Sequence, residues 1–87
     1  MFKIAETDTL VKNNRKKKLE HIYEKIRSDI YPVISREPHF GPNIKKLTGN
    51  LEGLYRYRIG NYRLVYTLNE EDKIIFMNEL VHRKDVY

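Results

Sequence analysis

The chain has 87 residues, no cysteine, and 17 lysines and arginines against 12 acidic residues, a formal net charge of +5. This length predicts one domain over residues 1–87, and the basic balance favours a polyanionic partner such as nucleic acid. Because thiolates are absent and the three histidines are scattered, we expect no disulfide, metal or cofactor. The N-terminus lacks the apolar core of a signal peptide, and no run approaches the ~20 apolar residues that span a bilayer. We therefore expect a cytoplasmic protein without membrane contact.

The first part of the chain is predicted to be a short strand followed by helices. Residues 2–6 form the strand, and Thr7 or Asp8 can cap a helix because either side chain accepts a hydrogen bond from free backbone amides. Apolar residues then recur at helical spacing, interrupted by the polar run 13–18. This pattern predicts two antiparallel helices joined by a turn.

Prolines end the helical part, and strands follow. Pro32 should kink or restart the second helix, and Glu37-Pro38 should stop it before a loop over residues 38–42. The apolar period then changes to two, which predicts three strands, at residues 53–59, 62–68 and 73–81. The sequence thus predicts an α+β fold: a small antiparallel sheet built from one strand, two helices and three strands, with the helical pair packed on one face. The other face is expected to be at least partly open.

The two-residue turn Gly60-Asn61 sets Arg58 directly opposite Arg63 on neighbouring strands. Like charges that face each other in a sheet repel, and Arg56 lies on the same face. Strand alternation places the tyrosines and aliphatic residues on the opposite face. A chain that tolerates this repulsion is expected to hold the arginines for an anion, since guanidinium groups match phosphate oxygens and i, i+2 spacing is roughly 6.5 Å. The alternative is a solvated face whose charges are dispersed by water.

Lys45 and Lys46 extend the basic stretch just before this hairpin. Together with Arg56 and Arg58 they are predicted to contact a nucleic-acid backbone. Surface lysines kept for solubility are the alternative interpretation.

The C-terminal residues bring together a histidine, His82, a cation, Arg83, and an aromatic residue, Tyr87. A metal-independent ribonuclease needs such groups: a base, a proton donor and cations for the charged transition state. A turn at residues 69–72 would place Asn78 beside Arg63, with His82 on the same face about four residues, or roughly 13 Å, further along. A one-residue slip would exchange His82 for Arg83, and spacing alone leaves both possibilities open.

The other histidines are less informative. His21 lies in the second helix and is interpreted as a surface or packing residue. His39 lies in a proline-bounded loop beside Phe40, where a loop contact is the simpler interpretation and a role in a site the alternative.

Three segments resemble toxins of the RelE/ParE superfamily from bacterial type II toxin–antitoxin pairs: residues 41–47, the hairpin 55–66 and the C-terminal segment 82–87. The order of strand, two helices and three strands also agrees. The resemblance implies a ribosome-dependent messenger-RNA endonuclease that stops translation until a cognate antitoxin masks it.

The resemblance also implies roles for individual residues. Arg63 corresponds to the arginine that stabilises the transition-state phosphate, Arg83 to one that donates a proton or stabilises charge, and Tyr87 to the stacking tyrosine. Arg56 and Arg58 stand where RelE carries lysines implicated in base catalysis and RNA contact. Because an arginine stays protonated, these two are expected to hold the RNA backbone.

We expect His82 to take an acid or base role, with the general base otherwise unassigned. A competing interpretation comes from the ParE branch of the superfamily, whose members bind and poison DNA gyrase and are not nucleases. A small RNA-binding module without chemistry is a third interpretation, although it gives the C-terminal motif no role.

Overall fold

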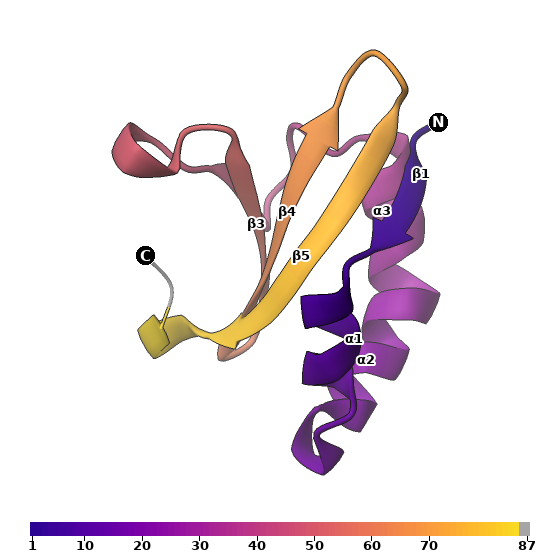
Figure 1. Cartoon of the computed structure of the whole chain (residues 1–87), viewed down its shortest axis with the longest axis vertical. Helices are drawn as coiled ribbons and strands as arrows, with labels where there is room; N and C mark the ends of the chain where they lie inside the picture. The colour runs from indigo at the N-terminus through magenta and orange to yellow at the C-terminus, as the bar shows by residue number, and fades with distance from the viewer. Residues whose placement is uncertain (86–87) are drawn as a thin grey trace.

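The computed structural model describes residues 1–85. Its strands are β1 (Lys3–Glu6), β2 (Ile44–Lys46), β3 (Leu54–Ile59), β4 (Tyr62–Asn69) and β5 (Ile74–His82). Its helices are α1 (Asp8–Asn14), α2 (Glu20–Lys25) and α3 (Tyr31–Arg36), with a π-helical turn η2 (Ile26–Ile30) between α2 and α3. Short 3-10 turns are η1 (Lys17–Leu19), η3 (Gly49–Leu51) and η4 (Arg83–Asp85). The helices pack on one side of the sheet, which confirms the α+β class (Figure 1).

The sheet has the strand order β1-β5-β4-β3-β2 and is mixed. The β3–β4 and β4–β5 pairs are antiparallel, as predicted, and β2 also pairs antiparallel with β3. The predicted sheet was wholly antiparallel, whereas β1 runs parallel to β5. The helices lead from β1 to β2, which lies at the opposite edge of the sheet and runs antiparallel to β1. Because each later strand reverses direction, β5 runs parallel to β1. The short strand β2 was not predicted, because three residues carry too little alternation to be recognised.

The helical boundaries confirm the sequence prediction. Thr7 caps α1, its hydroxyl accepting a hydrogen bond from the Leu10 amide at 3.3 Å. The second helical segment ends at Arg36, one residue before Glu37-Pro38. Pro32 lies in the first turn of α3 and cannot donate to the preceding turn, which accounts for the wider π-helical turn before it. No helix in residues 1–85 is long and apolar enough to cross a membrane.

We call the side of the sheet that packs on the helices the covered face. Its core joins residues of α1, η1, η2 and α3 with residues of β3, β4 and β5: Leu10, Leu19, Ile26, Ile30, Ile34, Tyr55, Leu64, Tyr66, Ile75, Met77 and Leu80. Each fully buried aliphatic side chain contributes roughly 1.5–3 kcal/mol to stability. The core therefore fixes which strand residues face inward.

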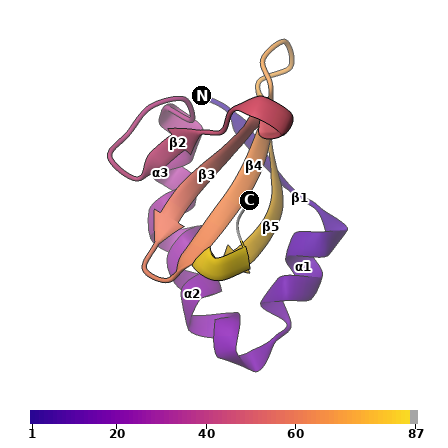
Figure 2. The ribbon, with the colours of Figure 1, turned by 90° about the vertical axis from the view of Figure 1, so that its left-hand side faces the viewer.

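We call the other side of the sheet the open face. It carries the alternate residues of the same strands, among them Arg56, Arg58, Arg63, Glu79 and Val81. Figure 2 shows this side of β3, β4 and β5 turned toward the viewer, with the helices behind. The predicted division of the sheet into a packed and an open side is therefore confirmed.

Helix α1 holds the part of β5 that β1 does not reach. The Thr7 hydroxyl donates to the carbonyls of Met77 at 2.9 Å and Asn78 at 2.8 Å, and Asn13 Oδ1 accepts from the Leu80 amide at 3.1 Å. At this point β5 bulges: Val65 pairs with Glu79 and the next residue of β4 pairs with Met77, so Asn78 has no partner on β4. The bulge sets which residues of β5 face each side beyond Asn78.

Candidate functional site

The β3–β4 hairpin has the predicted register. Arg58 lies opposite Arg63, and Gly60, with φ of 56°, takes the first position of the two-residue turn. Glycine at this position suits a type II′ turn, because L-residues rarely adopt a positive φ. The turn therefore fixes the arginine pair from local sequence alone.

The three hairpin arginines form a basic group on the open face. Arg56 Nη1 donates to the Asn43 carbonyl at 3.0 Å, and Arg63 Nη1 donates to the carbonyls of Gly60 and Tyr62 at 2.9 and 2.8 Å. Burial, followed by the charges of Arg63 and Arg58, lowers the pKa of Arg56 from its ordinary value. Within residues 1–85, the ion pairs shorter than 4 Å all involve His39, so none of these guanidinium groups is paired with a carboxylate there.

The two candidate lysines lie on opposite sides of the sheet. Lys45 pairs with Arg56 and shares the open face, whereas Lys46 pairs with Tyr55 of the core. Both belong to β2, the strand that the sequence did not predict, so their alternation could not be anticipated. Only Lys45 joins the arginines.

The predicted register of β5 is wrong. Val81, not Asn78, lies opposite Arg63, and His82 lies opposite Tyr62, which packs against the core. Two differences together shift the partner of Arg63 by three residues, from Asn78 to Val81. The turn occupies residues 70–73 instead of 69–72, with Lys73 at φ 54°, and the bulge inserts Asn78. An odd total shift moves every later side chain of β5 to the other face. His82 therefore does not share the face of Arg63.

The same shift brings Glu79 to the open face, where sequence reasoning had not placed it. Glu79 pairs with Val65, in the cross-strand row that also holds Lys45 and Arg56. Among strand residues on the open face it is the one acid within the described part of the chain. The sequence pattern alone could not place Glu79 on this face, because its position depends on the bulge.

Arg83 begins η4 immediately after β5. Its backbone amide donates to the Asn61 carbonyl at 2.7 Å, beside the turn whose Gly60 carbonyl accepts from Arg63. Arg83 is exposed. The hairpin turn thus brings the backbone of one predicted site arginine next to the guanidinium group of another. The predicted Tyr87 lies outside the described residues.

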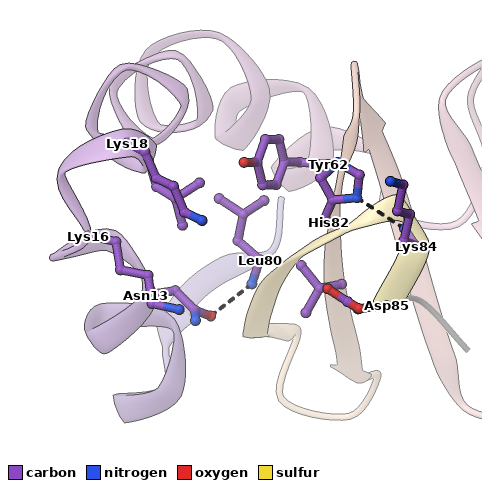
Figure 3. Close-up of a pocket in the computed structure, with 10 residues that line it drawn as sticks. Asn13, Lys16, Lys18, Tyr62, Leu80, His82, Lys84 and Asp85 are labelled. Atoms are coloured by element: carbon purple, nitrogen blue, oxygen red, sulfur yellow. Dashed lines mark hydrogen bonds between the residues drawn. The ribbon is translucent and has the colours of Figure 1, made fainter.

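His82 lines a different feature, a pocket of about 430 Å³ between the start of η1 and the end of β5. Its ring meets that of Tyr62 edge-on with 5.4 Å between centroids, and its Nδ1 accepts from the Lys84 amide at 3.2 Å. In the neutral ring the proton is then on Nε2. Figure 3 shows His82 and Lys84 on one side of this pocket and Lys16 and Lys18 on the other.

The remaining histidines have separate surroundings. His39 lies between Glu37, 3.0 Å from Nδ1, and Glu70, 2.7 Å from Nε2, which together raise its pKa. It therefore ties its loop to the β4–β5 turn, the simpler of the two interpretations. His21 is exposed on α2. Within residues 1–85 no three His, Asp or Glu side chains are grouped so as to hold a metal ion.

Solved structures with this fold include toxin–antitoxin complexes. The RelBE2 complex from Mycobacterium tuberculosis shares 27% identity and a TM-score of 0.70, covering 94% of this chain and 98% of the other. The RelB–RelE complex from Methanococcus jannaschii shares 29% identity and a TM-score of 0.70, covering 94% and 93%. The YoeB/ParE toxin from Agrobacterium tumefaciens has a TM-score of 0.75 over 93% and 98%, and at 20% identity shows the fold alone.

A search of curated protein sequences gave no match. A family model described as the ParE toxin of the type II toxin–antitoxin system parDE matches residues 6–87. The predicted resemblance to the RelE/ParE superfamily is thereby confirmed. The chain belongs to the ParE toxin family of type II toxin–antitoxin systems.

Proposed function

We propose that this toxin, as one domain over residues 1–87, is a metal-independent, ribosome-dependent messenger-RNA endonuclease that inhibits translation in the cytoplasm. The observation that carries the proposal is the group of three arginines on the open face, unpaired with any carboxylate within residues 1–85. The similarity to RelE-containing complexes at 27% and 29% identity supports it.

The open face favours a phosphate because its charges repel one another. Arg58 faces Arg63 directly, and the charges of both add to the effect of burial in lowering the pKa of Arg56. A bound phosphate would offset this repulsion, and guanidinium groups donate to its oxygens in pairs. Lys45, next to Arg56 across the strands, extends the backbone-binding row.

Cleavage on this face needs a base that accepts the ribose 2′-hydroxyl proton while the 2′-oxygen attacks phosphorus and the bond to the 5′-oxygen breaks. We assign this role to Glu79, because Glu79 lies two residues before Val81, the residue that pairs with Arg63. A diagonal cross-strand neighbour lies roughly 7–8 Å away, which leaves room for a phosphate between the two side chains. Arg63 stabilises the charge on the non-bridging oxygens, and Arg83 stabilises it further or protonates the 5′-oxygen.

The roles predicted for His82 and Tyr87 are separate from this step. An acid or base role for His82 requires RNA to pass round the end of β5, because the ring lies on the side of Tyr62. Stacking of a base on Tyr87 stays a prediction. A cognate antitoxin is proposed as the protein partner, covering the sheet and its basic open face, since RelB accompanies RelE in the structures that resemble this chain.

The test is messenger-RNA cleavage on programmed ribosomes, mapped by toeprinting. Arg63→Ala is expected to lower the cleavage rate about 100-fold or more, as removal of a transition-state donor does. Glu79→Gln is expected to lower the rate at least as much as His82→Gln does. Arg36→Ala, an exposed arginine at the end of α3, is the matched control and should cleave at the unmodified rate. Unchanged cleavage by Arg63→Ala would contradict the proposal.

Gyrase binding without nuclease activity is the second candidate, and the match to the ParE family model favours it. A DNA supercoiling assay with purified gyrase, run beside the toeprint, separates the two. Inhibition of supercoiling without RNA cleavage would replace the nuclease assignment. Cleavage without inhibition would support it.

A further inference from the structure

The pocket beside His82 adjoins the open face, because Val81 of that face is among its lining residues. It holds about 430 Å³ and is lined by the α1–η1 connection on one side and by the end of β5 with η4 on the other. This volume is within the range of small-ligand sites, which run from about 300 to 1,000 Å³. Because the two walls are far apart in sequence, the fold itself forms the pocket.

The lining is basic. Lys16 and Lys18 extend from the connection, and Lys84 of η4 lies beside His82 on the other wall, with one acid, Asp85 (Figure 3). None of the three lysines is in an ion pair shorter than 4 Å with any other residue of the described chain. Lysines on both walls of one concave space attract an anion with several acceptor oxygens.

The walls are held in place before any ligand arrives. Asn13 Oδ1 accepts from the Leu80 amide at 3.1 Å, which fixes the α1 wall to β5 and leaves the amide group of Asn13 as a donor. Nδ1 of His82 is engaged by the Lys84 amide, so in the neutral ring Nε2–H is the remaining donor. A preorganised set of donors binds with a smaller loss of entropy.

Part of the pocket lining, which we call the floor, is apolar. Leu19 and Leu80 are buried at 3% and 2% exposure, and Tyr62 packs against the same core. A ligand that places charged oxygens among lysines and a flat or apolar part over such a floor has the chemistry of a nucleotide.

The geometry points to one occupant: we propose that this pocket binds a phosphate, with its nucleoside, of the same RNA strand that the open face holds. This inference rests on the proposed function and extends its RNA path. Tyr62 is adjacent to Arg63, and His82 is adjacent to Val81, the partner of Arg63, so the two sites meet where β4 begins and β5 ends. In this proposal the RNA strand runs from the arginines, past the start of β4 and the end of β5, into the pocket.

The test compares two double variants of equal charge from one segment of the chain. Lys16→Gln/Lys18→Gln removes two pocket lysines, whereas Lys12→Gln/Lys17→Gln removes two exposed lysines that do not line the pocket. Binding of a trinucleotide, of a single-stranded RNA about twelve nucleotides long and of an oligoglutamate of equal charge is measured over a range of salt concentrations.

The pocket variant is expected to bind the longer RNA roughly tenfold more weakly, with a salt slope smaller by about 1.4, since each lost phosphate contact on a single strand removes about 0.7. Its trinucleotide binding and the control variant's longer-RNA binding should change less than about twofold. Equal losses in both variants, no loss in either, or an equal loss for oligoglutamate would overturn the pocket assignment alone. Failure of the unmodified toxin to bind either RNA would overturn the proposed function as well.

Discussion

The two faces of the sheet are built from the same strands, but one packs against the helices and the other carries the candidate site. On the covered face, Leu64 and Tyr66 are fully buried and hold the helices. On the open face, Arg63 lies one residue away and is held by exposed or half-buried hydrogen bonds to the turn. Residues that specify the fold therefore alternate with residues available for a ligand, and changes to the two faces should separate stability from function.

The largest effect on stability is expected on the covered face. Leu64→Ala should lower the free energy of unfolding by about 2–5 kcal/mol, because a fully buried leucine leaves a cavity. Arg63→Ala should cost less than about 1 kcal/mol, because its hydrogen bonds lie near solvent. Urea denaturation monitored by circular dichroism measures both. Equal losses would show that the open face also holds the fold.

A smaller effect is expected where α1 meets the bulge. Thr7→Val should cost about 1–2 kcal/mol, because the hydroxyl caps α1 and binds the carbonyls of Met77 and Asn78. Thr9→Val, on the exposed side of α1, is the matched control and should cost less than about 0.5 kcal/mol. Hydrogen exchange of the β5 amides should also quicken in the Thr7 variant alone. Unchanged exchange would mean that the bulge is held without Thr7.

On the open face, one substitution is expected to raise the free energy of unfolding instead of lowering it. Arg58→Thr should raise the free energy of unfolding by roughly 0.2–1 kcal/mol, because it removes the like charge opposite Arg63. The same variant should bind RNA more weakly, since one phosphate contact is lost. Denaturation and RNA titration on one preparation test the pair of effects. A loss of stability would contradict the interpretation of the arginine pair as repulsive.

The smallest effect concerns the loop that joins the helices to β2. The pKa of His39 is raised by Glu70 and Glu37, so protonated His39 stabilises the fold below its ordinary pKa of 6.5, and this contribution is lost as the pH rises through the raised value. Glu37, whose pKa is lowered by His39, loses its contribution as the pH falls through that lowered value, below 4.5.

His39→Gln should therefore reduce stability most between these limits and least at alkaline pH. Thermal melts across this pH range measure the difference, with the exposed His21→Gln as the control. A destabilisation independent of pH would assign the effect to the lost ring contacts of His39 with Phe2 and Tyr55 instead.

Local sequence determined much of this protein. The cap of α1, the stop before Pro38 and the Gly60-Asn61 turn each depend on neighbours within a few residues. The stop and the turn were predicted correctly, and Thr7 is one of the two caps predicted. The opposition of Arg58 and Arg63 follows from the turn alone. The arginine pair at the centre of the candidate site could therefore be predicted from the sequence.

Tertiary structure decided the rest. The three residues of β2 become a strand only by pairing with β3, and that pairing separates Lys45 from Lys46. The bulge at Asn78, where Thr7 binds β5 from a distant part of the chain, places Glu79 instead of His82 on the side of Arg63. Side chains alternate with a period of two, so one inserted residue reverses every assignment beyond it. Sequence spacing fixes a register across a short turn, but contacts between distant segments fix it across a bulge.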